Sequence, residues 1–128
     1  MIVKCKGVER VSMVTDSLRP AGLDVKTSIS GSKEDGQPCI IEDGVAKFLD
    51  RTAFLGSIQL GMDLVRTMYR KVGATLPDAI RMMTENPAKI LRIDDHKGRL
   101  LPGYDADVAL FDEELAVRHV FYGGRKVV

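Results

Sequence analysis

The apolar positions of the chain follow two periods, which predict a mixture of strands and helices. Residues 11–15 form a nearly continuous apolar run, typical of a strand buried on both faces, and the run stops at Asp16. Alternating apolar and polar positions predict a half-exposed strand over residues 24–30. Residues 38–41 and 45–49 flank the turn-forming Glu42-Asp43-Gly44 and predict a hairpin.

Helical spacing predicts a long amphipathic helix over residues 58–72, with Ser57 as its N-cap. A second helix is expected to begin after Thr75, with Pro77 in its first turn, where proline is tolerated. The apolar positions that these helices are expected to bury are Leu60, Leu64, Val65, Met68, Ile80, Met82 and Met83.

Asn86-Pro87 is predicted to interrupt that second helix, because proline disfavours a helical conformation in the residue before it. Residues 88–91 then predict a short helix that packs through Ile90 and Leu91. We interpret Asn86-Pro87-Ala88 as a packing and turn device.

Strands return near the C-terminus. Residues 106–111 predict a buried strand, and residues 117–122 and 125–128 flank the Gly123-Gly124 turn of a second hairpin. The edges of these strands would be exposed unless they pair with each other or with another copy.

Composition narrows the function classes. The 19 Lys and Arg residues nearly balance the 18 Asp and Glu residues, so no charge excess favours binding of nucleic acid or of an anionic membrane. Cys5 and Cys39 show neither a disulfide framework nor the paired spacing of a zinc site, which favours reduced thiols. No apolar run is long enough for a signal peptide or a membrane span, and we expect a cytoplasmic protein.

Asp16 is the first candidate for chemistry. In barrels of parallel strands, the residues that follow the C-terminal ends of strands carry the chemistry, so Asp16 is a candidate proton-transfer or metal-facing residue. The alternative from the residues alone is an Asp that caps the turn before Pro20 and Gly22.

Four segments resemble one family in the same order along the chain. Val14-Thr15-Asp16-Ser17 followed by Pro20-Ala21-Gly22 resembles the last barrel strand and following loop of N-acetylglucosamine-6-phosphate deacetylases, members of the amidohydrolase superfamily. The other three segments are Leu55-Gly56-Ser57, residues 84–91 with Asn-Pro-Ala, and residues 97–108 with Gly-Tyr-Asp-Ala-Asp. The last two occur widely in the superfamily, whereas the first two point to the sugar deacetylase.

The resemblance implies an α/β fold. Residues 1–24 and 50–93 would form the last strand and helices of a partial TIM barrel, residues 25–49 a hairpin or meander, and residues 94–128 strands of a small β-sandwich. A complete eight-stranded barrel needs 200 or more residues, so a chain of 128 is expected to be the C-terminal portion of a larger enzyme.

The implied reaction is hydrolysis of an N-acetyl group from an amino-sugar phosphate, which gives an amine and acetate. Asp16 would exchange protons with the attacking water and the leaving amine, and it is also a possible metal contact. Leu55, Gly56 and Ser57 would contact the sugar; relatives commonly carry a small residue where Leu55 stands, and a plain helix N-cap is the alternative for this segment.

The resemblance also implies a divalent metal, zinc or iron, in the full-length enzyme, held by a Glu and two His from earlier barrel strands. This chain alone is expected to bind none, because His96 and His119 resemble ordinary surface or edge histidines and Asp94-Asp95 a solvated turn. The full-length enzyme is expected to form a homo-oligomer, namely a dimer. Its expected partner is a small molecule, an amino-sugar phosphate.

Two other hypotheses stay open at this point. A cyclic amidase of the dihydroorotase or hydantoinase type would carry the same Asn-Pro-Ala and Gly-x-Asp-Ala-Asp segments. Alternatively, the 128 residues are a non-catalytic structural fragment, and we expect no deacetylase activity from the chain by itself.

Overall fold

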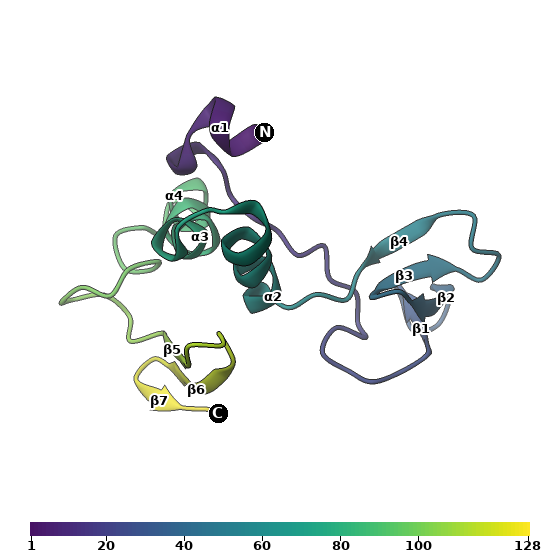
Figure 1. The fold of residues 1–128 in the computed structure, drawn as a ribbon. Helices are drawn as coiled ribbons and strands as arrows, with labels where there is room; N and C mark the ends of the chain where they lie inside the picture. The colour runs from purple at the N-terminus through teal and green to yellow at the C-terminus, as the bar shows by residue number, and fades with distance from the viewer. The chain divides into compact units, whose positions relative to one another are not determined.

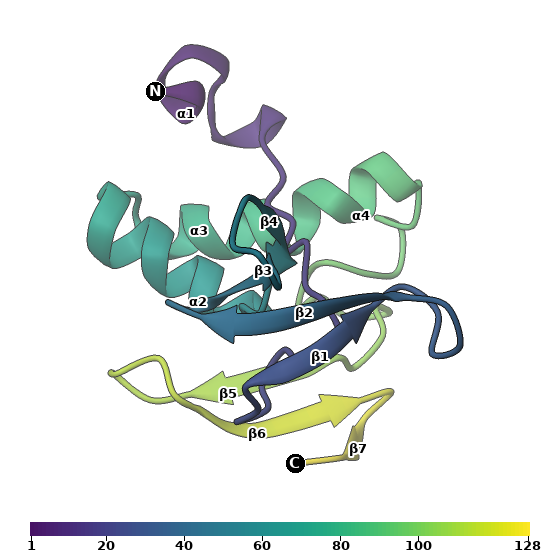
Figure 2. The same cartoon turned by 90° about the vertical axis from the view of Figure 1, so that its right-hand side faces the viewer.

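The computed structural model describes residues 1–128 and divides into two compact units, Met1–Met13 with Val65–Val128, and Val14–Leu64. Its elements are seen in two views (Figures 1 and 2). In chain order they are α1 (Ile2–Lys6), η1 (Val8–Arg10), β1 (Thr27–Ser30), β2 (Gln37–Glu42), β3 (Val45–Phe48), β4 (Phe54–Ser57), α2 (Gly61–Arg66), η2 (Thr67–Val72), α3 (Leu76–Met83), α4 (Glu85–Leu91), β5 (Val108–Phe111), β6 (Val117–Tyr122) and β7 (Arg125–Lys126).

The unit Val14–Leu64 is built on one antiparallel sheet in the order β1-β2-β3-β4. The predicted hairpin is confirmed, since β2 and β3 pair across a turn in which Asp43 and Gly44 both have positive φ, 53° and 76°. That combination defines the type I′ turn that matches strand twist. Cys39 on β2 and Ala46 on β3 are buried. The strand predicted over residues 24–30 begins later, at Thr27.

Residues 11–15 form no strand, contrary to the prediction of a buried one. A strand is maintained by regular hydrogen bonds to a neighbour, and here the Met13 N–H donates instead to the carbonyl of Met82 in α3, at 2.9 Å. Val14 is 79% exposed. The only strand-like pairing near this segment is one isolated parallel bridge between Ser17 and Ser57.

The first long helix begins later than predicted. Ser57 ends strand β4, and α2 starts at Gly61, so the prediction that Ser57 caps this helix is wrong. The Asp63 carboxylate accepts the Leu60 N–H at 2.8 Å and so satisfies a donor at the helix start. Leu60 therefore lies outside the helix and is half exposed.

Helix α3 matches its prediction. Thr75 is the N-cap, and its hydroxyl accepts the Asp78 N–H at 3.3 Å, while Pro77 lies in the first turn. The side chain of Met82 is completely buried, which confirms it as a core residue. Helix α3 contacts α4, η1 and η2 within its unit.

The predicted interruption is present but lies two residues earlier, at Thr84 between α3 and α4, and Asn86 and Pro87 are themselves helical residues of α4. Pro87 is the third helical residue, where its missing N–H would have had no partner in the helix. The helix buries Asn86 and Ala88, whereas Ile90 and Leu91, predicted to pack, are 71% and 67% exposed. The earlier start of the helix puts a different face against the core.

The C-terminal strands pair with each other in the order β5-β6-β7. The hairpin turn is confirmed, with positive φ at both Gly123 and Gly124. The prediction that this strand is buried is wrong. Strand β5 lies at the edge of a three-stranded sheet and exposes Ala109 and Leu110.

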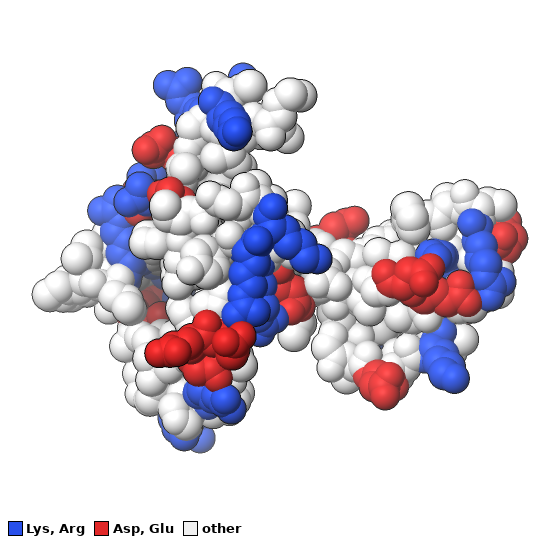
Figure 3. All heavy atoms as spheres, viewed as in Figure 1, with Lys and Arg blue, Asp and Glu red and all other residues white.

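The structure is therefore mixed α/β with two small antiparallel sheets. Lys and Arg are interspersed with Asp and Glu over the face drawn in Figure 3, in line with a formal net charge of +1. None of the helices is both long and apolar enough to cross a membrane.

Candidate active site

Asp16 has an unusual backbone conformation. Its φ is +50°, in the left-handed region that costs most non-glycine residues roughly 1–2 kcal/mol and that Asp and Asn tolerate best. The side chain is exposed. Backbone outliers of this kind persist where surrounding contacts enforce them, and they cluster at functional sites.

Strand β4 supplies those contacts. The Ser57 N–H donates to the carbonyl of Asp16, and the Leu18 N–H donates to the carbonyl of Ser57, each at 2.9 Å. Ser17 and Ser57 form the parallel bridge between these two bonds. The unit Val14–Leu64 thus brings Asp16 beside Leu55-Gly56-Ser57, two predicted site segments that lie far apart in the sequence.

Gly56 is required for this approach. A Cβ atom at position 56 would lie 2.9 Å from Cγ of Leu18 and 3.1 Å from the carbonyl oxygen of Asp16. Real Cβ atoms essentially never approach a heavy atom as closely as the first distance. The absence of a side chain at Gly56 is therefore used by the fold itself.

Ser57 and its neighbours are tied into the loop after β4. The Ser57 hydroxyl accepts the Gln59 N–H at 2.8 Å, and the Ser17 hydroxyl donates to the carbonyl of Gln59. The Ser57 amide is already bonded to Asp16. The Ser57 amide therefore has no free N–H to offer a ligand. The half-buried Leu55 side chain keeps part of its surface exposed.

The Asp16 carboxylate has its oxygens available. It takes part in no hydrogen bond or ion pair in the structure. The nearby cation in the sequence, Arg19, donates instead to the carbonyl of Gly31 at 2.9 Å. A general base needs a carboxylate that is free to accept a proton from a bound water or substrate, and Asp16 meets that requirement.

The side chains of this chain do not by themselves compose a metal centre. No group of three or more His, Cys, Asp or Glu residues is arranged to hold an ion. Asp16 offers one oxygen donor, whereas protein-bound zinc takes three or four protein ligands. His96 pairs with Asp95 at 2.6 Å, and His119 is exposed on β6, as predicted for surface histidines.

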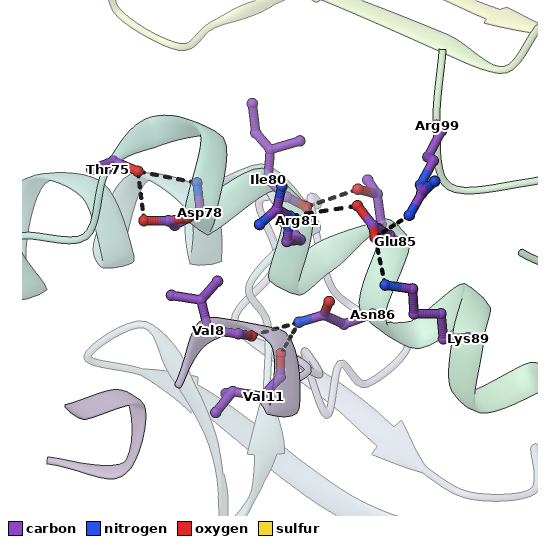
Figure 4. A network of polar contacts seen from close by, with 11 residues as sticks. Val8, Val11, Thr75, Asp78, Ile80, Arg81, Glu85, Asn86, Lys89 and Arg99 are labelled. Atoms are coloured by element: carbon purple, nitrogen blue, oxygen red, sulfur yellow. Dashed lines mark hydrogen bonds and ion pairs between the residues drawn. The ribbon is translucent and has the colours of Figure 1, made fainter. Parts of the chain in front are cut away.

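Asn86 has a larger structural part than the sequence indicated. Its side-chain amide donates to the carbonyls of Val8 and Val11, at 2.7 and 2.6 Å, from a position only 3% exposed (Figure 4). The predicted packing role is confirmed. The sequence signal was the Asn-Pro-Ala motif, but nothing in it identified the segment of residues 8–11 as the partner.

Comparison with known proteins adds the family. The sequence model of the amidohydrolase family matches residues 3–127. The chain belongs to this family. N-acetylglucosamine-6-phosphate deacetylase of Lysinibacillus sphaericus is 28% identical to this amidohydrolase over 125 residues, which are 98% of the chain and 31% of the relative. An N-acetylgalactosamine-6-phosphate deacetylase of Escherichia coli is 29% identical over 94% of the chain and 31% of the relative.

A solved structure extends the similarity to the fold. It is that of a variant N-acetyl-D-glucosamine-6-phosphate deacetylase from Mycobacterium smegmatis in complex with N-acetyl-D-glucosamine-6-phosphate. This chain is 27% identical to it with a TM-score of 0.87, and the match covers 99% of the chain and 33% of that protein. The chain thus spans about a third of the length of the relatives that it matches.

Proposed function

We propose that this amidohydrolase chain contributes the proton-transfer residue to an amino-sugar-phosphate deacetylase, whose reaction releases acetate from N-acetylglucosamine 6-phosphate. The supporting observation is the pairing of Asp16 with strand β4, which holds an exposed, unpaired carboxylate beside the Leu55-Gly56-Ser57 segment. Similarity to deacetylases over nearly the whole chain supports the choice of substrate class.

Asp16 acts first as a base and then as an acid. It accepts a proton from the water whose oxygen attacks the acetyl carbonyl carbon, so that a tetrahedral intermediate forms. The same proton then passes to the amide nitrogen as the carbon–nitrogen bond breaks, which gives the free amine and acetate. A divalent metal, zinc or iron, would polarise the carbonyl and lower the pKa of the attacking water.

Leu55, Gly56 and Ser57 lie where they can border the sugar next to Asp16. The exposed part of Leu55 offers an apolar surface to a sugar face or to the acetyl methyl group. The Ser57 hydroxyl accepts one bond from Gln59 and retains a proton that it can donate to a substrate oxygen.

The larger architecture belongs to the same proposal. Residues 1–24 and 50–93 would supply the last strand and helices of a TIM barrel, residues 25–49 a meander, and residues 94–128 strands of a β-sandwich. The metal-binding Glu and His residues would come from barrel strands outside these 128 residues. Dimer formation and a cytoplasmic location stay predictions.

The epimeric substrate is the second candidate. N-acetylgalactosamine-6-phosphate deacetylase matches the chain as well as the glucosamine relative does, at 29% against 28% identity. The two sugars differ in the configuration of one hydroxyl. Only a hydrogen bond to that hydroxyl would separate them strongly.

Acetate release tests the proposal. We expect acetate from N-acetylglucosamine 6-phosphate with the metal-loaded protein expressed from its complete natural reading frame, and none from the 128 residues alone. Asp16→Asn keeps the size of the side chain and its tolerance of positive φ but removes the base, so kcat should fall by about 10²–10⁴-fold. N-acetylgalactosamine 6-phosphate is assayed in parallel.

Three results would contradict the proposal. Acetate release by the 128-residue chain at an enzymic rate would show that no further segment is needed. Full activity of Asp16→Asn would remove the proton-transfer role. An intact, metal-loaded protein that released no acetate from either sugar phosphate would redirect the search to cyclic amides.

A further inference from the structure

We infer that Gly56 is a positioning residue for Asp16, and that it acts by letting the backbone of residues 16–18 lie directly against strand β4. This inference rests on the proposed function of Asp16 as the proton-transfer residue. It gives Gly56 a different role from the sugar contact that its segment suggested, and the two roles predict different kinetics.

The clamp on Asp16 has two hydrogen bonds, both to Ser57. One runs to the carbonyl of Asp16 and the other from the N–H of Leu18, each at 2.9 Å. Because the two bonds lie on either side of Ser17, the segment cannot slide along β4 without losing both. The Ser17 hydroxyl adds a third attachment, to the carbonyl of Gln59.

Gly56 lies against both residues that make these bonds, Asp16 and Leu18. The two nearest atoms to a Cβ at position 56 would be Cγ of Leu18, at 2.9 Å, and the carbonyl oxygen of Asp16, at 3.1 Å. A methyl group there would push the segment away from β4 at the residue that carries the carboxylate. The bonds from Ser57 to Asp16 and Leu18 hold the left-handed φ of Asp16, +50°, so this φ would relax as the bonds lengthened.

Displacement of a base affects catalysis more than binding. A shift of about 1 Å in a reacting group can cost about 100-fold in rate. Sugar binding would be conserved, because the segment that leaves β4 carries the base and not the sugar contacts. Loss of an interaction made only in the transition state lowers kcat while KM is maintained, whereas loss of a uniform binding contact raises KM.

The test uses Gly56→Ala in the protein from the complete reading frame. We expect kcat for acetate release to fall about 10- to 100-fold with KM changed less than about 2-fold. Adding Leu18→Ala to Gly56→Ala removes the closer of the two obstructing atoms and should restore part of the lost kcat. Gly73→Ala is the matched control, because Gly73 also resists a side chain, with φ +79°, but has no atom within 4 Å of a Cβ.

Each outcome decides the inference. If Gly56→Ala raises KM and leaves kcat unchanged, Gly56 belongs to sugar binding and the inference is overturned. The inference is also overturned if Gly56→Ala loses no more kcat than Gly73→Ala does, or if the double variant recovers no kcat. If the unsubstituted protein releases no acetate, the proposed function fails by itself. The three-bond coupling between HN and Hα of Asp16, measured by NMR, then decides: an unchanged coupling in Gly56→Ala refutes the clamp, and an altered one supports it.

Discussion

Asn86 joins helix α4 to the segment that precedes Asp16, and its removal should destabilise the unit that contains both partners. Its side-chain amide is the one donor to the carbonyl of Val11, at 2.6 Å, and it also bonds the carbonyl of Val8, at 2.7 Å. The Val8 carbonyl keeps a second donor, the N–H of Val11 at 3.3 Å. Asn86→Ala therefore leaves the carbonyl of Val11 without a hydrogen-bond donor and leaves the carbonyl of Val8 with one donor instead of two.

The magnitude follows from these partners. Loss of a donor costs about 1 kcal/mol where the acceptor keeps another bond and about 2 kcal/mol where it is left buried without one. Two effects offset this. The Asn86 amide oxygen is itself buried without a partner, so its removal recovers about 1 kcal/mol, and alanine is the better helix former by about 0.5 kcal/mol. We expect a net loss of about 2 kcal/mol once the cavity is included.

Asn86→Asp separates hydrogen bonding from size. The new carboxylate would face two carbonyl oxygens in a buried site, which should cost about 4 kcal/mol at about pH 7, more than alanine. Its pKa would be raised in the folded state, so the stability that the protonated form contributes is present below the unfolded pKa and lost as pH rises. The variant should therefore recover at about pH 4, where one O–H can donate to a carbonyl.

Urea unfolding followed by far-ultraviolet circular dichroism measures these differences, with an unchanged m-value as the condition for comparing midpoints. Lys89→Ala on the exposed side of the same helix serves as control and should cost under about 1 kcal/mol. If Asn86→Ala also cost under about 0.5 kcal/mol, or if Asn86→Asp were no worse at about pH 7 than at about pH 4, the hydrogen bonds would not hold the segment as argued.

Two further predictions concern the same unit. Met82→Ala should lower the free energy of unfolding by about 3 kcal/mol, because the side chain is completely buried; calorimetry in which Met82→Leu was as damaging as Met82→Ala would exclude cavity formation as the cause. Glu85 bonds Arg99 and Lys89, which hold its pKa at about 2 (Figure 4). A pKa that is lowered in the folded state stabilises the fold at pH values above the unfolded-state pKa, and this contribution is lost as the pH falls toward about 2. Glu85→Gln should therefore lower the free energy of unfolding by about 1 kcal/mol near pH 7. The difference from the unsubstituted chain should vanish between about pH 4.5 and pH 2; a difference that persisted at the acid end would show that the charge is not the cause.

The sequence by itself determined the features that depend on a few neighbouring residues. Asp43-Gly44 and Gly123-Gly124 adopt the positive φ angles of tight hairpin turns, and Thr75 caps its helix. These outcomes follow from local sterics and from hydrogen bonds between residues less than one turn apart. The motifs that identified the amidohydrolase family are also contiguous stretches, so they could be recognised without a fold.

Only the tertiary structure decided which distant groups meet. The approach of Gly56 to Asp16 depends on a backbone pairing across the loop and sheet between them, and the donors of Asn86 reach carbonyls near the start of the chain. The same holds for burial: Ile90 and Leu91 are apolar but exposed, because the contact of α4 with α3 selects the face that carries Asn86 and Ala88. A hydrophobic pattern predicts that some face is buried, whereas the position of the helix start and of its neighbours determines which one.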